Sequence, residues 1–267
     1  MDATGTGNPT FHLLSESLEL CIHTVLYCRQ LYPASIFAPV TFLGLQIHVC
    51  RHDKINKYIS DTVRVASEGI LRGDIDSVVL TFFDEEANRF ASLREGRTLT
   101  GGSQTNSAGS AQLSQLTASP AKSPRTGEFQ NGILERFVFD FDSSLLKRHF
   151  QSTKPAAGSR GNDRGGQFPS KSLSNSFRNL LLRLTTTPPR TYPGSTSFRL
   201  GLQLAEVTKR DVEENQVLCD ALTGSEWFEE EKRNIYVARD RGVLKPIKSV
   251  VSSEQGISLE VYVEKVV

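Results

Sequence analysis

The sequence predicts an α+β fold in which three main helices pack on one mainly antiparallel sheet. Segments with the apolar spacing of helices and segments with the two-residue spacing of strands follow one another in the order helix, strand, helix, hairpin, helix, strands. A hydrophobic content of 38%, with 15 phenylalanines, is sufficient for a packed core. No internal repeat appears among the 267 residues, so we expect one domain of about 200 ordered residues.

The domain is expected to span residues 10–267, after a flexible N-terminus at residues 1–9. Two stretches interrupt it, at about 94–132 and 151–169. The first consists mainly of Gly, Ser, Thr, Asn and Gln, and the second is rich in Gly and basic residues. Because neither can bury enough apolar surface to offset the entropy of ordering it, we predict two disordered insertions.

The first helix is predicted from Thr10 to Tyr32. Its apolar residues at helical spacing are Leu14, Leu18, Cys21, Val25 and Cys28. Pro33 is expected to end it, because the residue before a proline is disfavoured in the helical conformation.

A single strand is predicted at Thr41–Val49, followed by a second helix at about Asp53–Leu71. The strand carries Leu43, Leu45, Ile47 and Val49 on one face. The buried stripe of the helix is Ile55, Ile59, Val63, Ala66 and Ile70. Asp53 is expected to be its N-cap, and Gly73-Asp74 is expected to end it.

The remaining elements are predicted from the same two spacings. A third helix is expected at about Ser170–Leu184. Strands are expected at Ser77–Phe83, Ile133–Phe141, Ser197–Leu204, near Asn234–Ala238 and at Ile257–Val263. On the last strand, Ile257, Leu259, Val261 and Val263 are expected to face the core. Alternation then places Ser258, Glu260, Tyr262 and Glu264 outward.

The charge and the cysteines restrict the class of protein. A net charge of +1 is not the signature of a chain that binds nucleic acid as a whole. Cys21, Cys28, Cys50 and Cys219 form no CxxC pair and no disulfide framework. No segment resembles a signal peptide or a membrane span. We therefore expect a chain of the nucleus or cytosol that makes no membrane contact.

Motifs of enzymes are absent from the sequence. It contains no phosphate-binding loop, no dinucleotide fingerprint after a strand, no G-x-S-x-G and no H-E-x-x-H. Cys50 and His52 are interpreted as a strand end and a helix start, because two ligands without a second pair make a weak metal site. The chain is expected to be no enzyme and to need no cofactor or metal.

One stretch is locally basic. From Lys147 to Arg178, Lys and Arg outnumber acidic residues seven to one. A mobile loop of this kind can contact phosphates without recognising sequence. The alternative, which we favour, is a soluble linker.

Several segments resemble the HORMA-domain family. Residues 26–37, LYCRQLYPASIF, resemble its first-helix signature, and residues 52–62, HDKINKYISDT, resemble the second helix of the accessory subunits of DNA polymerase zeta. VVLTFF and ILERFVFDF are similar to the long hairpin, and FRNLLLRL to the central helix. Trp227, LKPIK at 244–248 and LEVYVEK at 259–265 are similar to the C-terminal region.

The resemblance implies a HORMA fold with a C-terminal safety belt at about 205–267. In this family the belt crosses over a bound peptide, which adds a strand at a sheet edge. In the polymerase branch the peptide contains proline, which suits aromatic walls. Tyr58 and Trp227 match the aromatic positions that hold it.

The resemblance also implies a second binding face and a self-association face. Leu244, Glu260 and Tyr262 match positions that meet a Y-family deoxycytidyl transferase polymerase, although Glu260 departs from the uncharged residue expected there. Arg178 matches the central-helix arginine of the dimerisation face.

These matches predict a nuclear adaptor in translesion synthesis that joins the catalytic subunit of DNA polymerase zeta to the Y-family polymerase. A spindle-checkpoint or meiotic-axis HORMA protein with other peptides is the first alternative. A basic nucleic-acid-binding module that uses the 147–178 stretch is the second.

Overall fold

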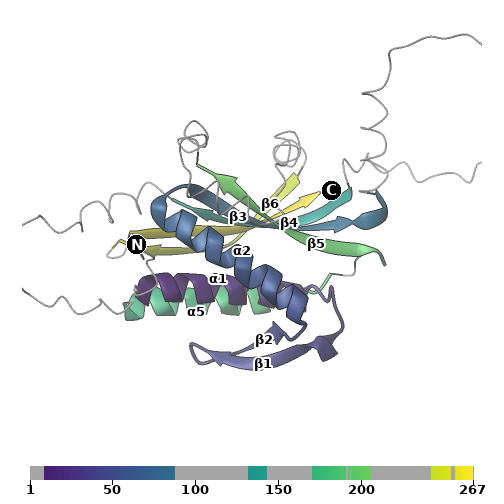
Figure 1. Ribbon diagram of the computed structural model, residues 1–267, viewed down its shortest axis with the longest axis horizontal. Helices are drawn as coiled ribbons and strands as arrows, with labels where there is room; N and C mark the ends of the chain where they lie inside the picture. Colours follow the sequence, from purple (N-terminus) through teal and green to yellow (C-terminus); the bar gives the residue numbers. More distant parts are fainter. Residues whose placement is uncertain are drawn as a thin grey trace, which may run out of the picture.

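The computed structural model describes residues 9–87, 132–142, 170–190, 192, 194–205, 242–253 and 256–266. The three main helices lie to one side of a five-stranded sheet, and a two-stranded hairpin lies beyond the helices (Figure 1). The predicted α+β class is confirmed. Nearly all of the two predicted insertions, Cys219, Trp227 and the strand expected near 234–238 lie outside the described residues.

Helix α1 (Pro9–Cys28) ends four residues earlier than predicted. Gln30 has a positive φ of 53°, and two backbone bonds close the helix end, from Gln30 N–H to Tyr27 C=O and from Leu31 N–H to Leu26 C=O. This pattern satisfies the last carbonyl groups of the helix with a left-handed residue. Pro33 therefore lies beyond the helix end and does not cause it.

The strand predicted at 41–49 is wrong, because this segment is a hairpin of β1 (Phe37–Phe42) and β2 (Leu45–Cys50), preceded by the short helix η2 (Ala34–Ile36). Leu43 and Gly44 both have positive φ angles, of 47° and 72°. Such angles are typical of a two-residue turn whose twist matches that of the flanking strands. The hairpin packs on α1, where the ring of Tyr27 stacks on His48 with centroids 3.9 Å apart.

Helix α2 (Asp53–Arg72) has the predicted length and buried stripe, in which only Ile55 is half-exposed. Its N-cap is His52 without a side-chain bond, so Asp53 is the first helical residue and not the cap that we expected. Gly73 ends the helix as predicted, with a φ of 76°.

The strands of the main sheet lie in the order β5 (Thr196–Leu204), β3 (Ile75–Asp84), β4 (Ile133–Phe141), β7 (Ile257–Val266) and β6 (Gly242–Ser252). Every neighbouring pair is antiparallel. Strand β6 was not predicted, because Lys245, Pro246 and Lys248 interrupt its apolar alternation. Helix α5 (Lys171–Thr185) starts where predicted, and the Ser170 side chain accepts a hydrogen bond from Leu173 N–H at 3.2 Å.

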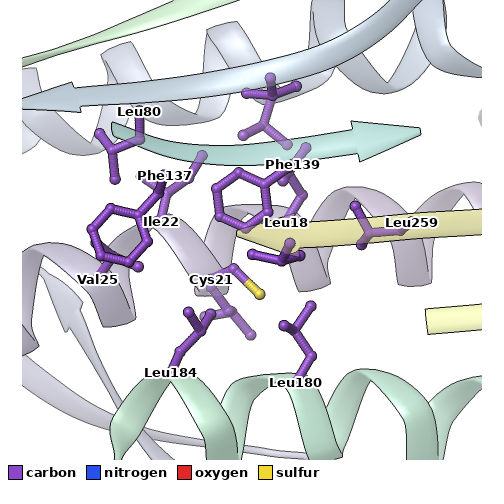
Figure 2. Close-up of a cluster of buried hydrophobic side chains, with 14 of the residues drawn as sticks. Leu18, Cys21, Ile22, Val25, Leu80, Phe137, Phe139, Leu180, Leu184 and Leu259 are labelled. Carbon is purple, nitrogen blue, oxygen red and sulfur yellow. The ribbon is translucent and has the colours of Figure 1, made fainter. Parts of the chain in front are cut away.

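The core lies between the sheet and the helices (Figure 2). Phe137 and Phe139 of β4 point toward Ile22 and Leu18 of α1, and Leu180 of α5 lies on the far side of the same cluster. Phe137, Phe139 and Phe141 are buried, and so are Ile257, Leu259, Val261 and Val263, as their alternation predicted. No helix in the described ranges is long and apolar enough to cross a membrane.

A buried ionic cluster fixes the chain that leads into β5. The guanidinium of Arg29, just after α1, binds both carboxylate oxygens of Glu135 on β4, at 2.8 and 3.1 Å. It also donates to Pro188 C=O at 2.6 Å, and the Tyr192 hydroxyl donates to Glu135 at 2.5 Å. Because Pro188 and Tyr192 lie between α5 and β5, the cluster sets where the edge strand β5 begins.

Candidate functional site

Strands β5 and β6 are the two edges of the main sheet, and they differ in their capacity to accept another strand. Each pairs on one side only, β5 with β3 and β6 with β7, among the described strands. β6 contains Pro246 and an irregular register between Pro246 and Lys248. A proline and a bulge both interrupt ladder bonding. β5 contains no proline along residues 196–204, and the one irregularity in its pairing with β3 lies at its end, where Asp76 of β3 is the extra residue between the partners of Leu204 and Gln203. β5 is therefore the edge suited to strand addition.

The orientation of the main-chain groups on β5 follows from one hydrogen bond. Leu200 N–H donates to the Tyr58 hydroxyl on α2 at 2.9 Å and therefore points away from β3. In an antiparallel ladder the N–H and C=O of one residue face the same side, and alternate residues share that side. Phe198, Leu200 and Leu202 thus direct their main-chain groups outward, where an added strand would bind.

Three aromatic side chains border this edge. The ring of Phe198 lies edge-on to Tyr32, with centroids 6.2 Å apart, and 5.9 Å from the ring of Tyr58. Tyr58 is 41% exposed. Burial raises the pKa of both tyrosines above its ordinary value, so both hydroxyls keep their protons at neutral pH. The edge thus combines main-chain bonding groups with an apolar wall that carries two hydroxyl tips.

Tyr58, one predicted residue of the peptide site, lies at this edge, and Trp227, the other, lies outside the described residues. Phe198 and Tyr32 were not predicted as residues of the site. Phe198 is the one aromatic residue on its strand, and Tyr32 is part of the first-helix signature. Those signals mark each residue separately and do not indicate that the two rings meet.

The three residues predicted for the second face lie together on the hairpin of β6 and β7. Tyr262 pairs with Pro246, Glu260 with Ser249, and Leu244 with Glu264. All three lie on the sheet face opposite the core, because Leu259, Val261 and Val263 face the core. Leu244 is 54% exposed, Glu260 is exposed and Tyr262 is half-buried.

Glu264 corrects one expectation. It lies on the predicted face of β7 but is only 7% exposed, and its carboxylate is 3.8 Å from the guanidinium of Arg136 on β4. Alternation gives the face of a strand and not the exposure of each side chain on it, since Leu244, which pairs with Glu264 on the same face, is 54% exposed. Glu264 therefore belongs to a buried ionic pair and does not extend the exposed face of Leu244 and Tyr262.

Arg178, predicted for self-association, is half-buried on α5. Leu182, four residues on, shares its side of the helix and is 44% exposed. Cys50 ends β2 and His52 caps α2, as interpreted from the sequence. In the ranges that the structure describes, no three His, Cys, Asp or Glu residues group as metal ligands do.

No protein-family model matches the chain. The mitotic spindle assembly checkpoint protein MAD2B of Rattus norvegicus is 31% identical over 80 residues, which are 30% of this chain and 38% of MAD2B. MAD2B of Homo sapiens is 30% identical over the same shares of both chains. The DNA polymerase zeta processivity subunit of Schizosaccharomyces pombe is 28% identical over 74 residues, 28% of this chain and 35% of that subunit. The matched segments thus span less than two-fifths of these relatives.

Solved structures match nearly the whole chain. A chain of the mitotic checkpoint complex superposes with a TM-score of 0.54 at 14% identity, over 97% of this chain and 99% of that one. HTP-1 of C. elegans, bound to the HIM-3 closure motif, superposes with a TM-score of 0.52 at 10% identity, over 96% and 89%. At these identities the superpositions show the fold. The chain thus has the HORMA fold, and a segment of it is similar in sequence to MAD2B and to the DNA polymerase zeta processivity subunit.

Proposed function

We propose that this chain is a non-catalytic adaptor that captures a proline-containing peptide along the free edge of β5. The observation that carries the proposal is the set of outward main-chain groups on Phe198, Leu200 and Leu202, bordered by the rings of Tyr32 and Tyr58. An extended peptide gains affinity from such main-chain groups and specificity from neighbouring side-chain surfaces. HTP-1, which has the same fold, is bound to a closure motif.

The topology supports a safety belt. β5 and β6 are consecutive strands of the described chain, yet they form opposite edges of the sheet. The two strands also run in the same direction. The connection from Ala205, just after β5, to Gly242 at the start of β6 must therefore cross four strand spacings, about 19 Å, and also return along the length of the sheet. A chain of this length reaches several times that distance. We propose that it passes over the bound peptide, with Trp227 as a second aromatic contact.

The relatives support a proposal for the partners. A segment of this chain is similar to the DNA polymerase zeta processivity subunit of Schizosaccharomyces pombe, and we propose that the peptide belongs to the catalytic subunit of that polymerase. The hairpin face of Leu244 and Tyr262 is proposed to bind a Y-family deoxycytidyl transferase polymerase, with the nucleus as the compartment. A checkpoint role stays an alternative, because a chain of the mitotic checkpoint complex shares the fold. A meiotic-axis role with another peptide is the other alternative within this fold. Direct nucleic-acid binding is the third candidate.

Replacing Tyr58 with Ala is expected to weaken peptide capture by about 2 kcal/mol, because the loss of an aromatic anchor at an interface costs this much or more. The measurement is calorimetry with a synthetic proline-containing peptide of the polymerase zeta catalytic subunit. Val251→Ala is the matched control, since Val251 is 58% exposed on the opposite edge strand. If Tyr58→Ala and Val251→Ala bind the peptide with equal affinity, β5 is not the edge that captures it.

The double variant Leu244→Ala with Tyr262→Ala is expected to abolish binding of the Y-family polymerase and to leave peptide capture unchanged. The reason is distance, because β6 and β7 lie at the opposite end of the strand order from β5. Pull-down of each partner measures the two activities separately. Loss of both partners in a variant with unchanged thermal unfolding would refute two independent faces.

A further inference from the structure

We infer that Thr187 is a phosphorylation site for a proline-directed protein kinase, and that its phosphate opens the junction that follows α5. The junction consists of residues 186–190, and its last four residues are Thr-Pro-Pro-Arg. Thr187 is therefore followed directly by a proline and, three positions on, by an arginine. Within the described ranges it is the one serine or threonine that precedes a proline. The inference does not depend on the proposed capture of a peptide.

Thr187 lies where a kinase can reach it. Helix α5 ends at Thr185, and residues 188–190 form neither helix nor strand. Pro188 and Pro189 are exposed, and Thr187 is half-buried. The Thr187 hydroxyl donates to Arg183 C=O at 3.2 Å in an exposed hydrogen bond, so its oxygen is not enclosed in the core. Irregular surface segments of this kind are the usual places at which another protein acts on a chain.

Pro188 and Arg190 define the class of kinase. Pro188 has no N–H, so it suits a kinase cleft without a hydrogen-bond acceptor at that position, where any other residue would leave its N–H unpaired. Arg190 supplies a cation for a carboxylate pocket. Its guanidinium lies 3.8 Å from Glu135 and is 35% exposed, and an ion pair of this length and exposure is weak. Arg190 can therefore leave Glu135 for the kinase.

The reaction transfers the terminal phosphoryl group of ATP to Oγ1 of Thr187. The O–H bond of the threonine breaks, and its proton passes to a base of the kinase. A bond forms from Oγ1 to the γ-phosphorus, the bond from that phosphorus to the bridging oxygen breaks, and ADP leaves. The side chain then carries a charge of about −1.5 to −2 at neutral pH.

The phosphate opens the junction for two reasons. The phosphorylated oxygen can no longer donate to Arg183 C=O. The phosphate also lies beside the last carbonyl groups of α5, which carry the partial negative charge of the helix C-terminus. The next residue, Pro188, accepts a hydrogen bond from Arg29 through its C=O at 2.6 Å. Opening therefore extends toward the ionic cluster that fixes the start of β5.

The site is tested by treating the folded full chain with a cyclin-dependent kinase, its cyclin, ATP and Mg²⁺, and mapping the phosphate by mass spectrometry. The starting protein is Ser119→Ala with Ser123→Ala, because these two serines also precede prolines. We expect phosphate on Thr187. A synthetic peptide of residues 182–192 is the positive control for the kinase. Absence of phosphate from Thr187 of the folded chain overturns the inference, whether the peptide is modified or not.

Recognition of the motif is tested on variants of the starting protein. Arg190→Ala should lower the rate of Thr187 phosphorylation about tenfold, the effect of losing one charge-assisted hydrogen bond. Arg190→Lys keeps the cation and should restore most of the rate. Thr186→Ala should leave the rate unchanged and is the matched control, since Thr186 is an exposed neighbour that no proline follows. Equal rates in Arg190→Ala and the starting protein would contradict the assigned class of kinase.

The effect on the junction is measured by amide hydrogen exchange of the chain with and without the phosphate. Thr186 N–H donates to Leu182 C=O at 3.2 Å, and Thr187 N–H donates to Leu184 C=O at 3.1 Å. We expect both amides to exchange about fivefold faster in the phosphorylated chain, the effect of losing one ordinary hydrogen bond. The N–H of Leu173, in the first turn of α5, is the internal control. Equal or slower exchange of the two threonine amides would show that the phosphate does not open the junction.

Discussion

Glu135→Ala is expected to lower the free energy of unfolding by about 3–5 kcal/mol, because it leaves the buried guanidinium of Arg29 without a counter-charge. Glu135 is fully buried and Arg29 is 2% exposed, so water cannot replace the lost carboxylate. The Tyr192 hydroxyl loses its acceptor at the same time. Urea denaturation of the wild-type chain and the variant gives the difference.

Two further variants separate this ionic pair from general damage to the core. Arg190→Ala is the control, because Arg190 lies 3.8 Å from the same carboxylate and is 35% exposed, so its removal should cost less than about 1 kcal/mol. The double variant Arg29→Met with Glu135→Leu removes both charges and should recover most of the loss. If Glu135→Ala unfolds at the same urea concentration as Arg190→Ala, the ionic cluster does not stabilise the fold.

The sequence predicted the elements whose apolar spacing is regular. Helix α2 and strands β3, β4 and β7 were found because each buries one continuous stripe or one alternating face. The hairpin of β1 and β2 was missed because Leu43, an apolar residue, continues the alternation through the turn. Leu43 has a positive φ, but leucine is not a residue type that predicts this backbone conformation. β6 was missed because its lysines and proline belong to an edge strand.

The candidate site was predicted only in part, for a different physical reason. Tyr58 was found through the family resemblance, but its contacts with Phe198 and Leu200 join residues about 140 positions apart. Arg29 and Glu135 are likewise separated by 106 positions. In a single sequence each is an ordinary charged residue, normally expected at the surface. Which distant segments pair depends on the packing of the sheet. The local spacing of apolar residues does not indicate it.

Lowering the pH from 6.5 to 4 is expected to reduce the free energy of unfolding by about 3 kcal/mol through His23. The imidazole is buried between α1 and β2, where its Nδ1 accepts a hydrogen bond from Cys50 N–H at 3.4 Å. Burial lowers the pKa of His23 from 6.5 to about 4. Between these values the unfolded chain binds a proton that the folded chain does not. The contribution of His23 to the free energy of unfolding is therefore fully present above about pH 6.5, and it stops falling below about pH 4.

The effect of His23 on stability must be distinguished from the effect of carboxylates that titrate in the same pH range. Glu19 lies 4.0 Å from Nε2 of His23, and burial raises the pKa of Glu19, which acts on stability in the opposite direction. His23→Asn keeps an acceptor for Cys50 N–H and removes the titration, so subtracting its profile isolates His23. The two unfolding profiles, measured at intervals between pH 7 and 4, should converge as the pH falls. Parallel profiles would mean that the imidazole is not the group responsible, because every other titrating group is common to both proteins.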